Sequence, residues 1–546
     1  MINIGIDFGS TTTMVSKYYN DIPSTIQPDG LTYNYPSIVV YDKNKNSYFY
    51  GSNARKRMGS RNTVTFRGFK MLLNQQMSIE NLHKRGYDEI NTPEYITSLF
   101  LRYVIENTLQ REGEDKVDTL VVGAPECWFQ SLETVDARTV LRKICSNMKD
   151  IVEKVKIVSE PTNAAAFSVW NYGREMNGAQ FEGKVLVVDY GGGTLDTALV
   201  EVRQQSMGLQ LKPEIRSGAG ENHDQEIGSA GIAYQEAVAR IAISEQLGKS
   251  PESILYDLDF NKFLKDFEEF LISEKELIKK TLDEFQFSVE DMKSEIFEHI
   301  DYGSEDIPVT FYHLYDAYQK VIAPILNHVL DETSVDINID DKIHISLVGG
   351  FCNFCLVQKQ IYDYFEISER DERVKGMIRE EAEREKAIAH GASLFASGAI
   401  SVCNVANFSI GTYAVYPNGD RFNRYAINIG QEIEADTVYF ALDDNGAPYP
   451  MTSGEIDKFL LNFTRNDEHA MNMKPKPQFA ERLRKIACGY VVVIGFSLDV
   501  EEQITVHVYN YDMENECIEE KPVDSLHLST IKGMFGSVVL KNIGGQ

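Results

Sequence analysis

The sequence predicts an α/β protein that continues into a β-rich C-terminal region. Up to about residue 398, short apolar strands alternate with helical segments, which is the pattern of a layered α/β domain. After about residue 400, segments such as 411–422 and 436–449 alternate apolar and polar residues. The turn signals Pro-Asn-Gly and Asp-Asn-Gly interrupt these segments, which favours antiparallel strands joined by tight turns.

Individual elements before residue 400 follow from local patterns. Segments 2–9, 119–125 and 155–161 are short apolar runs that end in glycine or proline, and we expect a strand in each. Residues 184–202 are two apolar runs around Gly-Gly-Gly and predict a hairpin. Further elements are expected as a strand at 343–351, helices near 94–111 and 383–400, and a mostly helical stretch at 228–300.

Composition excludes several classes of protein. Of the 546 residues, 43% are hydrophobic and 25% charged, which is typical of a folded globular protein. The formal net charge of −28 repels phosphate backbones, so we expect no nucleic-acid partner. No run of about 18 apolar residues occurs, and the first ten residues do not resemble a signal peptide. The lack of a long apolar run leads us to expect no membrane partner. Because the seven cysteines are scattered and odd in number, we expect a cytoplasmic protein.

Two glycine-rich turns are the clearest candidates for a functional site in this sequence. One is Asp-Phe-Gly-Ser-Thr-Thr-Thr at 7–13, and the other is Asp-Tyr-Gly-Gly-Gly-Thr-Leu-Asp at 189–196. Glycines let a backbone approach a phosphate and direct N–H groups at it, and hydroxyl groups add donors. A carboxylate beside a phosphate needs a cation between them, which predicts Mg²⁺ held largely through its waters. One such turn alone is more simply a tight turn, whereas two strand-flanked turns can clamp a nucleotide tail from opposite sides.

A third glycine pair, Gly349-Gly350, follows the predicted strand at its carboxyl end. Backbone without side chains lets a flat base or a ribose lie close, although an ordinary turn produces the same pattern. The chain contains no G-x-x-x-x-G-K-[ST] segment, so the P-loop class of nucleotide-binding proteins is excluded.

Taken in order, these motifs resemble the seventy-kilodalton heat-shock chaperone family, the DnaK-like proteins, within the superfamily of actin and sugar kinases. The matching stretches are IGIDFGSTTT, NTV…FKMLL at 62–73, VSEPTNAAAFS, VVDYGGGTLD, and SLVGGF followed by KAIAHGAS. The resemblance covers residues 1 to about 398. It implies an α/β two-lobed actin-like ATPase domain with ribonuclease-H-like halves, followed by a β-rich C-terminal domain.

The resemblance also implies domain boundaries. A nucleotide-binding domain would occupy 1–398, with inserted lobes at about 38–115 and 228–309. A linker at 399–408 would lead to a β-rich, substrate-binding-like domain at 409–546. Only 477–488 looks helical there, and its three turns are too short to cover a groove, so we expect this domain to have no helical lid.

The family's catalytic roles transfer to four matching positions. Lys70 would stabilise charge that develops on the γ-phosphoryl group, and Glu160 with Asp189 would position the attacking water. Thr194 would lie near the γ-phosphate. These roles suit phosphoryl transfer, in which placement and electrostatics supply most of the catalysis.

The remaining transferred positions hold the metal and the nucleotide. Asp7 and Asp196 would orient hydrated Mg²⁺. The nucleotide-binding positions are Gly9, Ser10, Thr11, Thr12, Gly191, Gly192, Gly193, Glu276, Lys279, Lys280, Gly349 and Gly350. The implied cofactors are ATP or ADP and Mg²⁺, with K⁺ as a candidate further ion.

The resemblance implies an ATP-binding and ATP-hydrolysing chaperone-like protein whose nucleotide state is coupled to the C-terminal domain. Its partners would be extended peptides or unfolded or folded protein clients, with a co-chaperone and a nucleotide exchange factor as candidates. Two alternatives stay open: an actin-like scaffolding or cytoskeletal ATPase, and a nucleotide-sensing binding protein that hydrolyses little ATP. A sugar kinase is disfavoured because nothing suggests a sugar pocket with its own base.

One departure from the family concerns the base-binding end. After the glycine pair the family has small residues and an arginine that stacks on adenine, whereas this chain has Phe351, Cys352 and Asn353. Cys352 and Cys355 form a C-x-x-C that is too small for a zinc site, and we expect them to pack near the adenine.

Two histidines and two tryptophans are expected to have structural roles and no role in binding a ligand. His223 and His390 are expected at the surface or as helix caps rather than as ligands. Trp128 and Trp170 are expected in the core.

Overall fold

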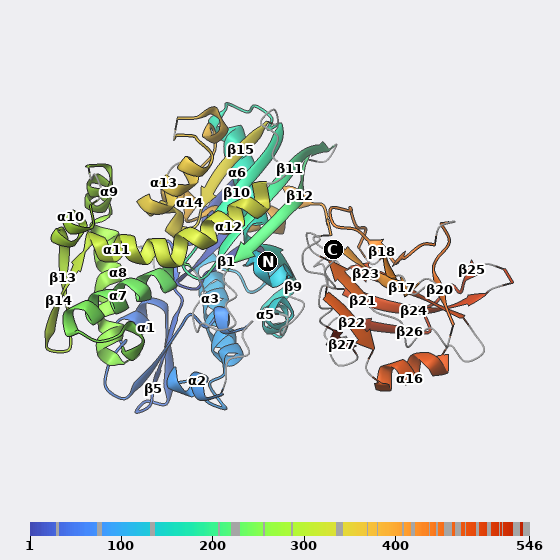
Figure 1. Ribbon diagram of the computed structural model, residues 1–546, viewed down its shortest axis with the longest axis horizontal. Coiled ribbons are helices and arrows are strands. Elements are labelled where there is room, and N and C mark those ends of the chain that lie inside the picture. The colour runs from blue at the N-terminus through green and yellow to red at the C-terminus, as the bar shows by residue number, and fades with distance from the viewer. Residues whose placement is uncertain are drawn as a thin grey trace, which may run out of the picture. The chain divides into compact units, whose positions relative to one another are not determined.

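The chain divides into two compact units in this computed structural model (Figure 1). They are Met1–Leu211 with Arg216–Ser401, and Lys212–Ile215 with Val402–Gln546. The structure describes residues 1–546 except 29–31, 74–78, 131–136, 206–207, 220–229, 255–256, 285–287, 335–341, 369, 379–380, 407–408, 416–420, 436, 444–445, 453–460, 465–470, 476, 487–490, 499–503, 513, 516, 528–534 and 539–546. No helix in the described part combines the length and apolar character that crossing a bilayer requires.

The first sheet of the larger unit contains the strands predicted near the N-terminus. Its spatial order is β3 (Ile22–Thr25), β2 (Thr12–Tyr19), β1 (Ile2–Phe8), β8 (Val117–Ala124) and β9 (Val152–Ser159), with β4 (Tyr35–Pro36) paired to β2. β1 runs antiparallel to β2 and parallel to β8. β8 is buried over nearly its whole length, as expected for a strand that is covered on both faces. The three strands predicted at 2–9, 119–125 and 155–161 are confirmed.

The second sheet repeats this arrangement. Its spatial order is β15 (Ile343–Val348), β10 (Gly183–Tyr190), β11 (Leu195–Gln205), β12 (Gly208–Ala219) and β16 (Ile400–Val402). β10 runs antiparallel to β11 and parallel to β15, as β1 does to β2 and β8. The predicted hairpin and the strand before the third glycine pair are confirmed. Each sheet therefore presents one glycine turn at the tip of a hairpin.

Two helices lie against these sheets at distances that only glycine allows. α6 (Glu160–Glu175) begins directly after β9 with proline in its first turn, and α15 (Ala387–Ser397) packs against both α6 and β1. A Cβ on Gly391 would lie 1.7 Å from the Asn163 carbonyl oxygen, and one on Gly5 would lie 2.3 Å from the Ser393 nitrogen. Gly391 thus lets α15 touch α6, and Gly5 lets β1 touch α15.

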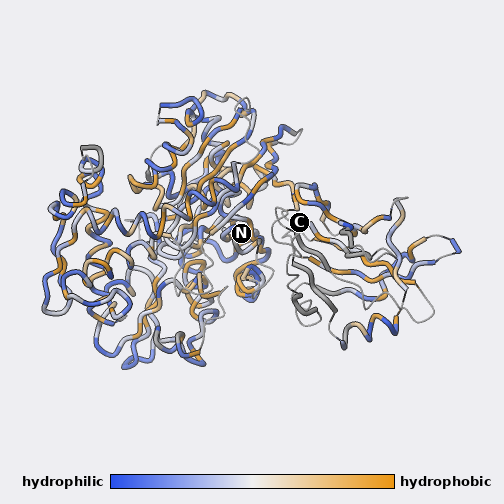
Figure 2. Tube along the Cα trace, viewed as in Figure 1, coloured by the Kyte–Doolittle hydropathy of each residue, from blue (hydrophilic) through white to orange (hydrophobic). Residues whose placement is uncertain are grey.

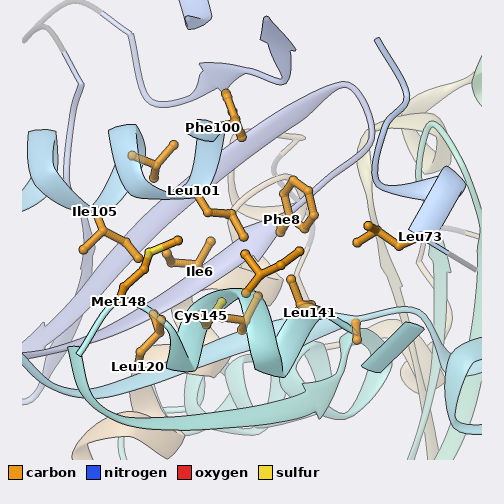
Figure 3. Packing of buried hydrophobic residues seen from close by; sticks show 14 of the residues in the cluster. Ile6, Phe8, Leu73, Phe100, Leu101, Ile105, Leu120, Leu141, Cys145 and Met148 are labelled. Atoms are coloured by element: carbon orange, nitrogen blue, oxygen red, sulfur yellow. The ribbon is translucent and has the colours of Figure 1, made fainter. Parts of the chain in front are cut away.

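A hydrophobic core fixes the first sheet against α3 (Pro93–Glu112) and α5 (Ala137–Ser146). α3 begins at the Thr92 cap, ends at the left-handed Gly113, and turns apolar residues inward at helical spacing. Figure 3 shows Phe100 and Leu101 of this helix meeting Phe8 of β1. Figure 2 shows that the central strands are hydrophobic along their length, while the outer loops are largely hydrophilic. The helix predicted near 94–111 is confirmed.

Most of the elements that lie between β12 and β15 in the sequence form one lobe (Figure 1). It comprises α7 (Gly231–Leu247), η2 (Pro251–Ser253), α8 (Leu258–Ser273), α9 (Lys275–Glu284), α10 (Val289–Ser294), β13 (Ile296–Tyr302), β14 (Glu305–Thr310) and α11 (Phe311–Ala317). The stretch at 228–300 is therefore helical as predicted only up to β13. β13 pairs with β14 around a turn in which Gly303 is left-handed, a signal that the sequence interpretation missed.

The remaining elements of the larger unit complete its periphery. They are β5 (Ile38–Asp42), β6 (Ser47–Tyr50), α1 (Gly51–Arg55), β7 (Thr63–Arg67), η1 (Met71–Leu73), α2 (Ile79–Lys84), α4 (Glu126–Gln130), η3 (Tyr318–Ile322), α12 (Ala323–Ser334), η4 (Gly350–Asn353), α13 (Cys355–Tyr364), η5 (Glu372–Val374) and α14 (Glu381–Arg384). The helix predicted at 383–400 is instead divided into α14 and α15, and strand β16 begins at Ile400.

The second unit is β-rich, as predicted. One sheet has the order β18 (Arg421–Ile427), β17 (Ser409–Val415), β21 (Leu461–Thr464), β22 (Met471–Pro475) and β27 (Phe535–Val538). The other contains β19 (Tyr439–Phe440), β20 (Pro450–Met451), β23 (Val491–Leu498), β24 (Ile504–Asp512), β25 (Cys517–Ile518) and β26 (Asp524–His527). Helix α16 (Pro477–Ile486) occupies the predicted helical segment, whose residues 487–488 lie outside the described part, as do 407–408 of the predicted linker.

The observed burial shows that two predictions, those for His390 and Trp170, were wrong. His390 is not at the surface: only 8% exposed, it bonds to the Thr25 hydroxyl through Nε2 at 2.9 Å and packs edge-on against Phe167. Trp128 is buried as predicted, whereas Trp170 is half-buried and stacks on Phe167. His223 lies outside the described residues.

Because it is buried, His390 should make the protein acid-sensitive. Burial and the nearby Lys386 lower the pKa of His390 from 6.5 to about 3. Below pH 6.5 the unfolded chain binds a proton that the folded one does not, so stability present at pH 7 is lost as pH falls toward 3. We expect this group to remove about 2 kcal/mol of the free energy of unfolding between pH 7 and pH 5.

Urea unfolding followed by tryptophan fluorescence tests this, because both tryptophans lie in the larger unit. The loss between pH 7 and pH 5 should shrink by about 2 kcal/mol in His390→Gln and stay unchanged in His328→Gln, whose side chain is 70% exposed. An equal loss in all three proteins would contradict the assignment.

Candidate functional site

The two predicted glycine turns face each other across a short gap. A Cβ on Gly192 would lie 2.2 Å from the Thr11 Oγ1, and one on Gly193 would lie 2.4 Å from the Ser10 Oγ. Only glycine therefore fits at either position of the second turn while the hydroxyls of the first turn lie opposite. The Gly191 N–H bonds to the Thr194 carbonyl at 3.1 Å and closes the second turn.

A cavity of about 740 Å³ opens between these turns. Most of the predicted site residues line it: Asp7, Gly9, Ser10, Thr11, Thr12, Lys70, Glu160, Asp189, Gly191, Gly192, Gly193, Thr194, Glu276, Lys279, Gly349 and Gly350. Lys280 and Asp196 are not among its lining residues, and the Lys280 side chain is exposed. The volume is in the range of small-molecule sites.

Asp196 belongs to a buried carboxylate cluster beneath the turns. One carboxylate oxygen each from Glu160, Asp189 and Asp196 lies within 4.8 Å of the others. Burial and the charge of Glu160 raise the pKa of Asp189 and of Asp196. For the same two reasons the pKa of Asp7 rises to about 7. The cluster thus holds more negative charge than its surroundings stabilise.

Lys70 provides a cation at the centre of this cluster. Its Nζ lies 2.5 Å from the Glu160 Oε1, and both side chains are almost fully buried. Although burial opposes it, the charges of Glu160 and Asp7 raise the pKa of the Lys70 ammonium. The rings of Phe8 and Trp128 each lie 5.9 Å from Nζ, so the ammonium is held by ion pairing and by aromatic faces.

The residues present fit a hydrated Mg²⁺. Carboxylate oxygens are the ligands that this cation prefers, and it usually keeps several of its waters. The buried Asp196 Oδ2 has no hydrogen-bond partner within the described part of the chain. Since an unpartnered buried oxygen is costly and the cluster has excess negative charge, Asp7 and Asp196 could hold such a cation.

The third glycine pair borders the same cavity. Gly349 is left-handed with φ +82°, and a Cβ on it would lie 2.5 Å from the Asp189 Oδ1. The turn therefore places its backbone directly against the carboxylate cluster. Cys352, in the following 3₁₀ turn η4, is fully buried, and burial with the charge of Asp189 raises its pKa to about 12. Packing is confirmed for Cys352, whereas Cys355 is partly exposed.

Three residues that neighbour the candidate site were missed from the sequence. The Glu126 N–H donates to the Asp196 Oδ1 at 2.7 Å, and the Glu126 carboxylate pairs with Arg216 at 3.4 Å. Arg384 lines the cavity beside Asn353. The only local signal was the proline that precedes Glu126. These residues contact partners that are far away in the sequence, so no regular spacing of residues indicates the contacts.

Paired α/β sheets whose glycine turns face one cavity are the arrangement of a two-lobed actin-like ATPase domain. The chain belongs to the Hsp70 family: the family model described as "Hsp70 protein" matches residues 3–410. Members of this family are chaperone-type ATPases that bind ATP or ADP with Mg²⁺, client proteins and co-chaperones.

Curated proteins also match this chain, at low sequence identity. The chaperone protein DnaK of Mycoplasmopsis synoviae (strain 53) is 28% identical over 224 residues, which are 41% of this chain and 32% of that protein. DnaK of Mycoplasmoides gallisepticum is 28% identical over 221 residues, 40% of this chain and 33% of that protein. DnaK of Metamycoplasma hominis is 26% identical over 222 residues, 40% and 32% respectively. The chain thus spans about a third of the length of these relatives.

Proposed function

We propose that this chain binds ATP and ADP with Mg²⁺ in the cavity and hydrolyses ATP to ADP and phosphate. The observation that supports this most directly is the pair of glycine turns facing each other above a buried cluster of carboxylates and one lysine. Backbone N–H groups and the hydroxyls of Ser10, Thr11 and Thr12 would bind the phosphates from two sides. Thr194 would lie near the γ-phosphate.

Each charged residue of the site would have its own role in the reaction. Bound Mg²⁺ would neutralise charge on the phosphates, and Asp7 with Asp196 would orient its waters. Glu160 and Asp189, which line the cavity below the turns, would position the attacking water. Lys70 would stabilise charge that grows on the γ-phosphoryl group as the bond breaks. At the other end, Glu276, Lys279 and the Gly349-Gly350 turn would contact the nucleoside, and Lys280 would lie just outside.

For the whole chain, we propose a chaperone-like role. The nucleotide state of the domain at 1–398 would be coupled through the linker at 399–408 to the β-rich domain at 409–546. That domain would bind extended peptides or protein clients, and a co-chaperone and a nucleotide exchange factor would act on the cycle. Support comes from the family and from the β-rich character of the second unit.

Nucleotide sensing with little hydrolysis is the second candidate. The observation that favours it is the altered base-binding turn, in which Phe351 and Asn353 replace the family's small residue and arginine. A single-turnover assay separates the two candidates, because only an ATPase converts bound ATP to ADP within the lifetime of the complex.

Removing either Mg²⁺-orienting carboxylate tests the central proposal. We expect Asp7→Asn and Asp196→Asn to bind ATP and ADP at least tenfold more weakly in Mg²⁺ by calorimetry, and to lose turnover. Without Mg²⁺ the difference from the parent protein should shrink, because the lost carboxylate acts through the cation. Asp115→Asn, at an exposed position, is the matched control.

Parent-like hydrolysis in either variant would overturn the assignment of that carboxylate. Coupling is tested in the same preparations by the release of a labelled extended peptide, whose rate should differ between ATP and ADP. Identical release rates in the two nucleotides would contradict coupling while leaving the ATPase proposal standing.

A further inference from the structure

A buried arginine lines the end of the cavity that the phosphate turns do not occupy. Arg384 is the last residue of α14 and is only 8% exposed, yet it belongs to the cavity wall. A guanidinium group stays charged in proteins and is seldom buried without a purpose. Nothing in the phosphate chemistry proposed above uses this side chain.

Two contacts tie Arg384 to the third glycine turn. Its Nη1 donates to the Asn353 Oδ1 at 3.4 Å, and its carbonyl oxygen accepts the Gly349 N–H at 3.4 Å. Backbone and side chain are therefore both fixed against the same turn.

One N–H donor of this guanidinium group takes no part in these contacts. The Arg384 Nε is buried and has no hydrogen-bond partner within the described residues. A buried donor without a partner is costly, and a ligand in the cavity would supply the missing acceptor or a flat surface. Because Arg384 also lines the cavity, its guanidinium group is a candidate contact for a ligand bound there.

The surroundings of Arg384 favour a flat aromatic ligand over a further phosphate. Phe351 and Phe354, on the same turn, line the cavity and stack at 5.5 Å with an angle of 11° between their rings. Glu385, the next residue after Arg384, also lines the cavity and would repel an anion at this end. Nucleobases stack on aromatic rings and on guanidinium planes, and purine rings offer acceptor nitrogens to an arginine donor.

We propose that Arg384 recognises the base of the bound nucleotide, with Asn353 holding its guanidinium group in place. The inference rests on the proposed function, since it concerns the same ATP site. The base-contacting cation would reach the third glycine turn from α14, about thirty residues further along the chain, rather than from the turn itself. Arg384 would thereby determine how strongly the base contributes to nucleotide affinity.

Comparing ATP with inorganic tripolyphosphate, which has no base, tests this assignment. In calorimetry with Mg²⁺, Arg384→Ala should weaken ATP binding at least tenfold and change tripolyphosphate binding less than twofold. Arg384→Lys should not restore ATP affinity, because an ammonium group has neither the plane nor the Nε donor of a guanidinium group. Arg373→Ala, at a position outside the cavity wall that pairs with Asp371, is the matched control.

Asn353→Ala keeps the test decisive if Arg384→Ala fails to fold. Releasing the guanidinium group should weaken ATP severalfold and again spare tripolyphosphate. The proposal is overturned if ATP affinity is unchanged in these variants, or if both ligands weaken equally. A parent protein that binds neither ligand would instead refute the proposed function, and one that binds tripolyphosphate as tightly as ATP would refute base recognition alone.

Discussion

Replacing Lys70 with alanine should slow ATP hydrolysis at least tenfold and leave ATP bound, a loss of about 1.4 kcal/mol or more of transition-state stabilisation. The ammonium group lies within the carboxylate cluster, 2.5 Å from the Glu160 Oε1, where little water screens its charge. Charge on the γ-phosphoryl oxygens increases as the bond breaks, so the cation is worth more in the transition state than in the ground state.

Single-turnover kinetics and calorimetry separate these contributions. In Lys70→Ala the rate of the chemical step should fall while the dissociation constant for Mg²⁺-ATP changes less, the pattern of an interaction made chiefly in the transition state. Lys320→Ala, at a side chain 66% exposed, should change neither quantity. If affinity falls and the rate of the bound complex does not, Lys70 is a binding residue and the proposed role is wrong.

Much of the fold was predictable because its signals are local. A hairpin such as β10–β11 is encoded by two apolar runs and the glycines between them, all within about twenty residues. A helix such as α3 shows its cap, its apolar spacing and its terminal glycine in one segment. The β13–β14 hairpin was missed because charged residues in its strands obscured the alternation that its glycine turn would otherwise have indicated.

Without the family resemblance, the candidate site was predictable only where chemistry and a turn coincide in the sequence. Asp7 and Asp189 each precede a glycine turn, so their types and positions suggested phosphate and metal together. Burial was not predictable for His390, because the side chains that cover it, Thr25 and Phe167, belong to distant segments. Arg384 could not be predicted for the same reason, since it reaches the third glycine turn only in the folded chain.

Breaking the ion pair between Arg216 and Glu126 should produce the largest loss of stability. The Arg216 Nε lies 3.4 Å from the Glu126 Oε1, and the two side chains are 4% and 0% exposed. We expect Arg216→Met to lower the free energy of unfolding by about 3–5 kcal/mol, because it deprives a fully buried carboxylate of its cation. That carboxylate lies beside Asp196, which accepts the Glu126 N–H and belongs to the carboxylate cluster, so repulsion adds to the cost of burial.

A double-mutant cycle followed by tryptophan fluorescence distinguishes this from a loss of packing. Glu126→Gln combined with Arg216→Met leaves neither charge and should recover most of the lost stability, since removing a whole buried pair is often close to neutral. Arg102→Met removes a comparable but exposed arginine, paired with Asp150 at 2.8 Å, and should cost about 1 kcal/mol or less. A double variant as unstable as Arg216→Met alone would show that the arginine stabilises the larger unit by its bulk. If Arg216→Met itself costs no more than the exposed control, the ion pair contributes little to the stability of the larger unit.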